Sequence, residues 1–229
     1  ANWEKMGVGV MFQVRKIQFV TANKGFLVAS DLSIQDDFYA TEDGGAHWAR
    51  VNYSFSRPRD LHFVNENFGV VIDRFSAIFI TEDGGANWQR IDWRGSTNEL
   101  TAVHFVDTTH GWAIGPSSIL RTENGGQNWS KLTDYGNDIY FTTVDNGFIA
   151  ADDGIHRTTD GGYNWQQVYA TATAPTPTQT PTKIQTSPLN SITFFGESQG
   201  WAVGDFGLIV HTTNGGDTWD VQPSGTNKD

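Results

Sequence analysis

Short apolar runs separated by turn residues recur along the whole chain at a regular spacing. In each of five units, an apolar-x-Phe run is followed six residues later by a Gly that opens a second apolar run. The pairs are Phe19 and Gly25, Phe63 and Gly69, Phe105 and Gly111, Phe141 and Gly147, and Phe194 and Gly200. A third apolar run and a Trp-led run complete each unit. Runs this short, rich in β-branched and aromatic residues, predict four β-strands per unit.

The turn between the third and fourth runs has one eight-residue form, Thr-x-Asp/Asn-Gly-Gly-x-x-Trp, in every unit. Its two glycines supply the positive φ angles of a tight turn, and the Asp or Asn side chain can accept from backbone N–H groups. We expect these residues to be structural, with metal binding or acid–base chemistry as the alternative. The acidic-position and Trp residues are Asp43 and Trp48, Asp83 and Trp88, Asn124 and Trp129, Asp160 and Trp165, and Asn214 and Trp219.

Four strands per unit, apolar on both sides, predict sheets that each pack between two neighbours. We therefore expect an all-β fold over residues 1–229: a single β-propeller domain of four-stranded antiparallel blades, one blade per repeat. An open array of meanders is the alternative, but it would expose long hydrophobic edges.

Both ends of the chain contain a segment that could form the fourth strand of the last blade. Trp3-Glu4-Lys5-Met6 matches the fourth-strand pattern, although Trp219-Asp220-Val221-Gln222 already fills that place in the last unit. We favour five blades, with the amino-terminal segment closing the ring by pairing with the last blade. The alternative is that this segment is the remnant of another blade.

A Pro/Thr-rich segment interrupts the regular spacing between units four and five. Residues 171–187 contain Pro175, Pro177 and Pro181 among threonines and have little apolar surface to bury. Such a composition predicts an extended, flexible insertion.

Charge and composition narrow the choice of partner. The 229 residues carry a formal net charge of −11, which argues against nucleic acid because phosphate backbones require a basic surplus. The sequence has no cysteine, so the fold uses no disulfide. The apolar runs are far shorter than the ~20 residues of a membrane helix, so we expect no direct membrane insertion.

The eight-residue turn resembles the Asp-box, which joins the third and outermost strands of propeller blades. The whole unit, apolar-x-Phe…Gly-Trp-Ala-Val-Gly…Ile-Leu-x-Thr-x-Asp-Gly-Gly-x-x-Trp, resembles the photosystem II stability and assembly factor family and its bacterial relatives. This resemblance covers nearly the whole chain and implies a non-catalytic propeller that binds partner proteins. It also implies export to a lumen or periplasm, so we expect an extracytoplasmic protein whose export signal is not included in residues 1–229.

Asp-boxes also occur in sialidases and xyloglucan-cleaving glycosidases, which makes an enzyme the alternative class. Nothing near the arginines resembles the sialidase Arg-Ile-Pro signature, and no Gly-x-Ser-x-Gly or His-Glu-x-x-His motif is present. His62 and His104 share the position before the inner Phe. They could line the central channel as metal ligands, although ordinary strand positions are the favoured interpretation. We therefore expect no catalytic residue, metal or cofactor.

Arginines and aromatic residues gather in the loops of units one to three that share one face of a propeller. These loops are the links between blades and the turns between second and third strands. Guanidinium groups bind carboxylates and rings supply contact area, as is typical of protein-binding patches. The predicted partner-binding residues are Arg15, Arg57, Arg59, Arg74, Arg94, Tyr53, Phe55 and Trp93.

The composition of this face predicts a protein partner with an acidic segment. The plain alternative is that its members are ordinary solvated loop residues. The alternative function is a carbohydrate-binding or sialidase-like glycoside-hydrolase propeller with a glycan ligand. In that case Trp93, Tyr53 and Phe55 would stack on sugar rings, and Asp31, Asp73 or Asp205 would act as acids.

Overall fold

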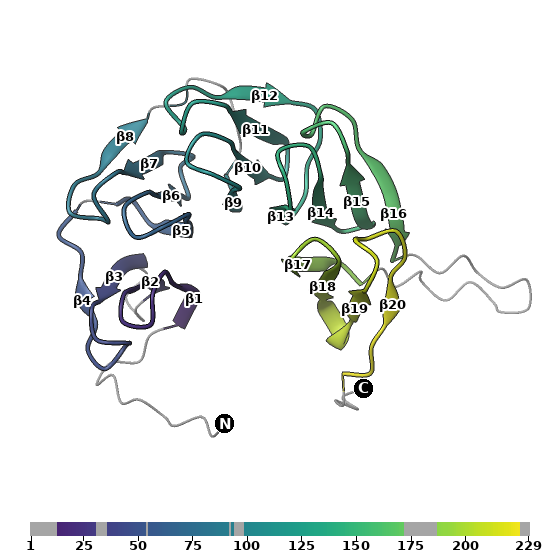
Figure 1. Cartoon of the computed structure of the whole chain (residues 1–229), viewed down its shortest axis with the longest axis horizontal. Coiled ribbons are helices and arrows are strands. Elements are labelled where there is room, and N and C mark those ends of the chain that lie inside the picture. Colours follow the sequence, from purple (N-terminus) through teal and green to yellow (C-terminus); the bar gives the residue numbers. More distant parts are fainter. Residues whose placement is uncertain are drawn as a thin grey trace, which may run out of the picture.

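The computed structural model describes residues 13–30, 36–53, 55–91, 93, 99–171 and 187–224. They form five four-stranded antiparallel sheets, which confirms the predicted five-bladed β-propeller (Figure 1). Within these ranges the single helical element is the 3₁₀ turn Asp205–Gly207. No helix in them has the length and apolar character needed to cross a membrane.

Each blade runs in chain order from its innermost to its outermost strand. Blade 1 consists of β1 (Gln13–Phe19), β2 (Gly25–Ser30), β3 (Asp36–Thr41) and β4 (Ala49–Arg50). Blade 2 consists of β5 (Pro58–Phe63), β6 (Gly69–Asp73), β7 (Ile78–Thr81) and β8 (Gln89–Ile91). Blade 3 consists of β9 (Ala102–Phe105), β10 (Gly111–Gly115), β11 (Ser118–Thr122) and β12 (Ser130–Leu132).

The two remaining blades repeat this order. Blade 4 consists of β13 (Asp138–Phe141), β14 (Gly147–Ala151), β15 (Gly154–Thr158) and β16 (Gln166–Ala170). Blade 5 consists of β17 (Leu189–Phe195), β18 (Gln199–Gly204), β19 (Ile209–Thr212) and β20 (Asp220–Val221).

The inner strands of successive blades contact one another in the order β1, β5, β9, β13 and β17. Among the described strands no comparable contact joins β17 to β1, and Figure 1 shows blades 1 and 5 on either side of a gap. The predicted closing segment, residues 3–6, lies outside the described residues. So do residues 172–186, which make up nearly all of the Pro/Thr-rich insertion.

The six-residue interval from Phe to Gly, which is the same in all five repeats, has a steric cause. In blade 2, Phe63 pairs with Gly69 across the β5–β6 ladder, and the Phe ring lies over the glycine. A Cβ at Gly69 would overlap the Phe63 ring, and the same overlap occurs at the corresponding glycine of every other blade. Each inner Phe therefore needs a partner without a side chain.

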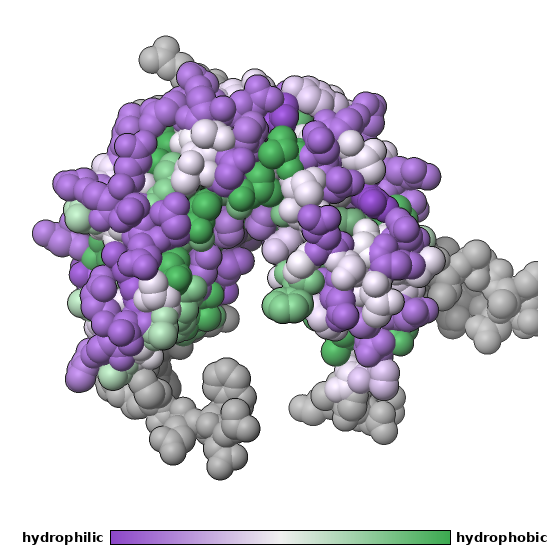
Figure 2. All heavy atoms as spheres, viewed as in Figure 1, coloured by the Kyte–Doolittle hydropathy of each residue, from purple (hydrophilic) through white to green (hydrophobic). Residues whose placement is uncertain are grey.

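Apolar side chains between neighbouring blades form the core. Stacked ring pairs cross three of the four blade–blade interfaces: Phe26 and Phe63 at 3.8 Å, Trp112 and Phe141 at 3.5 Å, and Phe148 and Phe194 at 4.5 Å between centroids. The tilted pair Phe68 and Phe105, at 5.5 Å, crosses the interface between blades 2 and 3. Such contacts combine large buried area with a defined ring geometry. In Figure 2 the outer rim is mostly hydrophilic, and hydrophobic areas lie toward the inner side of the arc.

In blades 1 to 4, the side chain before the inner Phe joins its blade to the next one. Gln18 exchanges two 2.8 Å hydrogen bonds with the backbone N–H and C=O of Phe63. The Nδ1 atom of His62 accepts from the Phe105 N–H at 3.0 Å, and Nε2 of His104 donates to the Phe141 carbonyl at 3.0 Å. The Tyr140 hydroxyl donates to the Phe194 carbonyl at 3.1 Å.

These contacts give His62 and His104 a structural role. Burial lowers the pKa of His62 well below its usual value of 6.5 and lowers that of His104 to about 4. Both rings are therefore neutral at pH 7, with one nitrogen of each engaged by the next blade. The part of the chain that the structure describes holds no cluster of three potential metal ligands.

We predict that His62→Gln reduces the acid sensitivity of the fold. Unfolded chains bind a proton at the His62 ring near its usual pKa, whereas the folded state resists it, so folding stability falls as pH drops below about 6.5. Glutamine fills the same position in blade 1 and does not titrate. Between about pH 7 and pH 5, the variant should lose about 1–2 kcal/mol less unfolding free energy than the parent. Urea titrations at both pH values measure this difference. The exposed-ring variant His47→Gln is the control, and an equal loss in the His62 variant and the parent would contradict the prediction.

We also predict a large difference between two equivalent isoleucines of the inner strands. Ile139 in blade 4 is 2% exposed and packs against blade 3, whereas Ile17 in blade 1 is 51% exposed. Ile139→Ala should cost about 2–4 kcal/mol because it leaves a cavity. Ile17→Ala should cost less than about 1 kcal/mol. Chemical denaturation of both variants measures the costs; similar values would show that Ile17 is packed in solution.

Candidate protein-binding face

Backbone hydrogen bonds between loops show which loops lie at each end of the propeller. Asp-box turns pair with the turns between first and second strands, as in the 2.8 Å bond from the Gly84 N–H to the Asn67 carbonyl. At the other end, the links between blades pair with the turns between second and third strands. Examples are Arg74 N–H to the Arg57 carbonyl at 3.1 Å and Asp205 N–H to the Pro188 carbonyl at 3.0 Å. We call this end the link face.

The Asp-boxes are closed by their own hydrogen bonds. In blade 2 the Thr81 hydroxyl donates to Asp83 at 2.9 Å and accepts from the Gly85 N–H at 2.8 Å, while Asp83 accepts from the Asn87 N–H at 2.8 Å. Bonds from Asn87 hold the pKa of Asp83 below its usual value. Asn124 and Asn214 accept through Oδ1 in the same way. The Asp carboxylates and Asn amides of the Asp-boxes are therefore engaged in hydrogen bonds within their own turns.

Two predicted arginines of the link face converge on one carboxylate. Arg59 lies at the start of β5, Arg74 lies in the turn between β6 and β7, and Glu99 precedes β9. Glu99 lies 3.0 Å from Nε of Arg74 and 3.7 Å from a terminal nitrogen of Arg59. We call these three residues the arginine cluster. The hydrogen bond from Arg74 is the main cause that lowers the pKa of Glu99.

Backbone contacts place Arg57 beside this cluster. Arg57 has φ 62°, and its carbonyl accepts the 3.1 Å bond from Arg74. Phe75, the residue after Arg74, is 68% exposed. Neither guanidinium of the cluster is buried, so both remain open to solvent and to a ligand. The face thus combines a solvent-accessible pair of guanidinium groups with an exposed ring.

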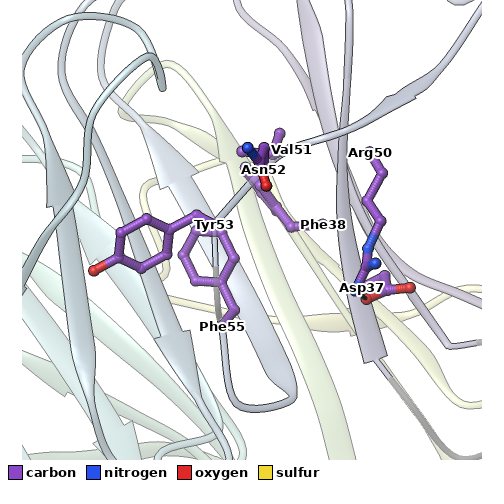
Figure 3. Close-up of a pocket in the computed structure, with 7 residues that line it drawn as sticks. All are labelled: Asp37, Phe38, Arg50, Val51, Asn52, Tyr53 and Phe55. Atoms are coloured by element: carbon purple, nitrogen blue, oxygen red, sulfur yellow. Dashed lines mark hydrogen bonds and ion pairs between the residues drawn. The ribbon is translucent and has the colours of Figure 1, made fainter.

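Tyr53 and Phe55, in the link between blades 1 and 2, line a pocket of about 300 Å³ together with residues of β3 and β4. Figure 3 shows the two rings together on one side, with the Arg50 and Asp37 side chains on the other. Arg50 and Asp37 form a 2.7 Å ion pair. Phe55 also packs against Phe38 of blade 1, so only part of its ring is available to a ligand.

The other predicted residues of the face are more scattered. Trp93 is half-buried and packs against the core between blades 2 and 3. Its indole nitrogen has no hydrogen-bond partner among the residues described. Arg15 is exposed on β1, and Arg94 lies outside the described residues. The structure therefore brings together Arg57, Arg59 and Arg74.

Sequence reasoning did not single out Glu99 or Arg50. It did place Phe75 with Arg74 among the loop residues of this face, where turn side chains are commonly exposed. Glu99 and Arg50 gave no signal in the sequence, because their roles depend on the side chains they meet in space.

The carboxylates of the alternative enzyme hypothesis have different environments. Asp73 is buried, and its Oδ1 accepts from the N–H groups of Phe75 and Ala77, each at 2.8 Å. Burial raises the pKa of Asp73. Asp205 is exposed and accepts from the Asn190 amide at 2.7 Å, in a different blade from Asp73. Asp31 lies outside the described residues.

Solved structures share this architecture at low sequence identity. A structure described as YCF48 bound to D1 peptide is 16% identical, with a TM-score of 0.62 over 93% of this chain and 69% of that one. YCF48 from Cyanidioschyzon merolae is 18% identical, with a TM-score of 0.56 over 97% and 88%. An ancestral GH74 enzyme is 17% identical, with a TM-score of 0.69 over 99% of this chain but only 33% of the enzyme. These similarities concern the fold.

The family follows from the sequence itself. The search of curated proteins gives no match to the chain. The family model described as photosynthesis system II assembly factor YCF48 matches residues 51–136 and 133–225, which together are most of the 229 residues. The chain therefore belongs to the photosynthesis system II assembly factor YCF48 family.

Proposed function

We propose that this protein is a non-catalytic assembly scaffold that binds an acidic segment of a partner protein on its link face. The arginine cluster carries the proposal, because two guanidinium groups from different structural elements already converge there on one carboxylate. A partner's carboxylate can use the same donors, since guanidinium groups form directed, charge-assisted bonds with carboxylates. Family membership, and the relative described as YCF48 bound to D1 peptide, support a peptide ligand.

Exposed apolar area next to the cluster complements the charge. The exposed Phe75 follows Arg74 directly, and Tyr53 lines the pocket beside β3 and β4. An acidic segment with apolar neighbours fits this combination, because rings supply contact area and arginines orient the acidic group. We also propose that the protein is exported and that its partner is not a nucleic acid.

A glycan-binding or glycan-cleaving propeller is the second candidate. The fold similarity to GH74 enzymes and the aromatic wall of the pocket favour it. Asp73 suits it poorly, since its carboxylate is buried and holds a turn. A glycan array and a glycosidase panel test this candidate; sugar binding that is lost in Trp93→Ala or Tyr53→Ala would favour it.

We predict that Arg59→Ala combined with Arg74→Ala weakens acidic-peptide binding about tenfold or more, because two charged hydrogen-bond donors are lost. Fluorescence anisotropy with a labelled D1 peptide and with poly-glutamate measures the effect, and poly-glutamine is the uncharged probe. The control is Arg90→Ala, an exposed arginine on outer strand β8. Binding of the parent should also weaken as salt is added. Equal affinity of the double variant and the parent would rule out the arginine cluster as the site.

We predict that Glu99→Gln strengthens acidic-peptide binding about two- to fivefold. The native glutamate competes for Arg59 and Arg74, and an exposed ion pair of this kind is worth up to about 1 kcal/mol. The matched control is Glu123→Gln, which removes a carboxylate paired with Arg121 at 2.7 Å beside an Asp-box. The same anisotropy assay measures both variants. Weaker binding by the Glu99 variant would show that Glu99 positions the arginines for the ligand.

A further inference from the structure

A groove beside the Asp-box turn recurs on the outer rim of blades 2 and 3. In both blades its lining includes the residue before the Asp-box Thr, the second, third and seventh residues of the Asp-box, and the first residue of the fourth strand. The blade 3 groove encloses about 360 Å³ and is also lined by Leu132 and by Tyr163 from the Asp-box of blade 4. We call it the rim groove. It lies beside the outermost strand β12 (Figure 1) and shares no residue with the arginine cluster.

Two side-chain amides in the rim groove lack partners that their counterparts have in other blades. Asn124 accepts through Oδ1 from the Thr122 hydroxyl and from the Asn128 N–H, each at 3.0 Å. Its Nδ2 atom and the Asn128 side-chain amide make no hydrogen bond to any residue that the structure describes. In the other four Asp-boxes the equivalent side chains bond to each other at 2.7 to 2.9 Å: His47 with Asp43, Asn87 with Asp83, Asn164 with Asp160, and Thr218 with Asn214. The rim groove therefore offers two amides to a ligand.

Arg121 fixes the aromatic wall of the rim groove and leaves the groove without net charge. Its guanidinium carbon lies 5.0 Å from the centroid of the Tyr163 ring, and its Nη1 atom donates to the Tyr163 hydroxyl at 2.8 Å. The same nitrogen lies 2.7 Å from the carboxylate of Glu123, which balances the charge. The Arg121 side chain is only 10% exposed, and its Nε atom has no partner among the described residues. A neutral ligand suits this paired arginine better than an ion, because an ion would have to displace one member of the pair.

The corresponding residues at two neighbouring blade junctions bond to each other instead. Gln127, at the position of Tyr163 in the blade 3 Asp-box, exchanges bonds of 3.3 and 3.4 Å with Gln89 of blade 2. Asp217, at that position in blade 5, pairs with Arg157 at 2.5 Å. Tyr163 also bonds to the preceding blade, but it does so through its hydroxyl and keeps 58% of the side chain exposed. The rim groove thus combines an exposed ring with unpaired amides.

We propose that the rim groove binds a neutral carbohydrate, with the Tyr163 ring against the apolar face of one sugar and the Asn124 and Asn128 amides bonded to its hydroxyls. A sugar hydroxyl both donates and accepts, as a side-chain amide does. An aromatic wall with a few convergent polar groups, in a concavity of this size, is typical of sites for small ligands. A peptide fits less well, because extended peptides are bound through backbone groups of a sheet edge, whereas the free groups here are side-chain amides. This site is independent of the protein-binding function proposed for the link face.

The test titrates the full chain, labelled with ¹⁵N, with cellohexaose, mannohexaose and galactohexaose, and follows the backbone amide signals of Asn128 and Tyr163 by NMR. We expect at least one of these sugars to shift both signals saturably. Tyr163→Ala should weaken that binding about tenfold or more and Asn128→Ala about threefold or more, because each removes one contact. Tyr163→Phe keeps the ring and should bind within about twofold of the parent. The matched control is Asn87→Ala in the equivalent groove of blade 2, which should leave the affinity unchanged.

Three results would overturn the carbohydrate site. The first is the absence of any saturable shift with all three sugars up to about 10 mM, which corresponds to binding too weak to be specific. The second is a sugar that shifts the Trp93 indole signal but not that of Tyr163, which would assign the sugar to the link face. The third is poly-glutamine shifting Asn128 and Tyr163 where no sugar does, which would identify a peptide as the ligand. Tyr163→Ala should bind acidic peptides as the parent does in the anisotropy assay, so failure of this site is distinguishable from failure of the arginine cluster.

Discussion

The packing of the inner phenylalanines is the constraint on which the rest of the propeller depends. Each ring lies over a glycine of its own blade and edge-on to the Trp of its own Asp-box, and in three interfaces it stacks face-on against a ring of the preceding blade. One side chain therefore fixes the hairpin, the turn at the outer strand and the position of the next blade. These residues keep a constant spacing in the sequence because every blade makes the same contact.

The core is formed by side chains of the strands. The loops of the link face can therefore carry charged residues without disturbing the core. Arg59 and Arg74 extend from a strand start and a turn of blade 2, and Glu99 reaches them from the link to blade 3. The arginine cluster thus spans two blades that the core already holds in a fixed relation. A rigid scaffold that positions loop side chains is the usual arrangement of binding sites on β-folds.

The blades could be predicted from the sequence, whereas the side-chain contacts on the link face could not. Repeated Phe, Gly and Asp-box positions predicted the strands, their order and the face on which each loop lies, because these depend on local turns and alternation. The pairing of Arg59 and Arg74 with Glu99 could not be predicted, since it depends on the path of a link with no repeat pattern. Phe55 and Trp93 looked like surface residues for the same reason, whereas the links fold them partly against the blades.

The mixture of Asp and Asn in the Asp-boxes has a consequence for behaviour in acid. Hydrogen bonds within the turns lower the pKa of Asp43, to about 2, and of Asp83 and Asp160. Their contribution to stability is therefore kept in mildly acidic solution and is lost only as pH falls through those lowered values. Asn124 and Asn214 accept the same backbone bonds through an amide that does not titrate. Blades 3 and 5 thus keep their outer turns under conditions that protonate the turns of the other three, so acid should loosen the propeller rim unevenly along the chain.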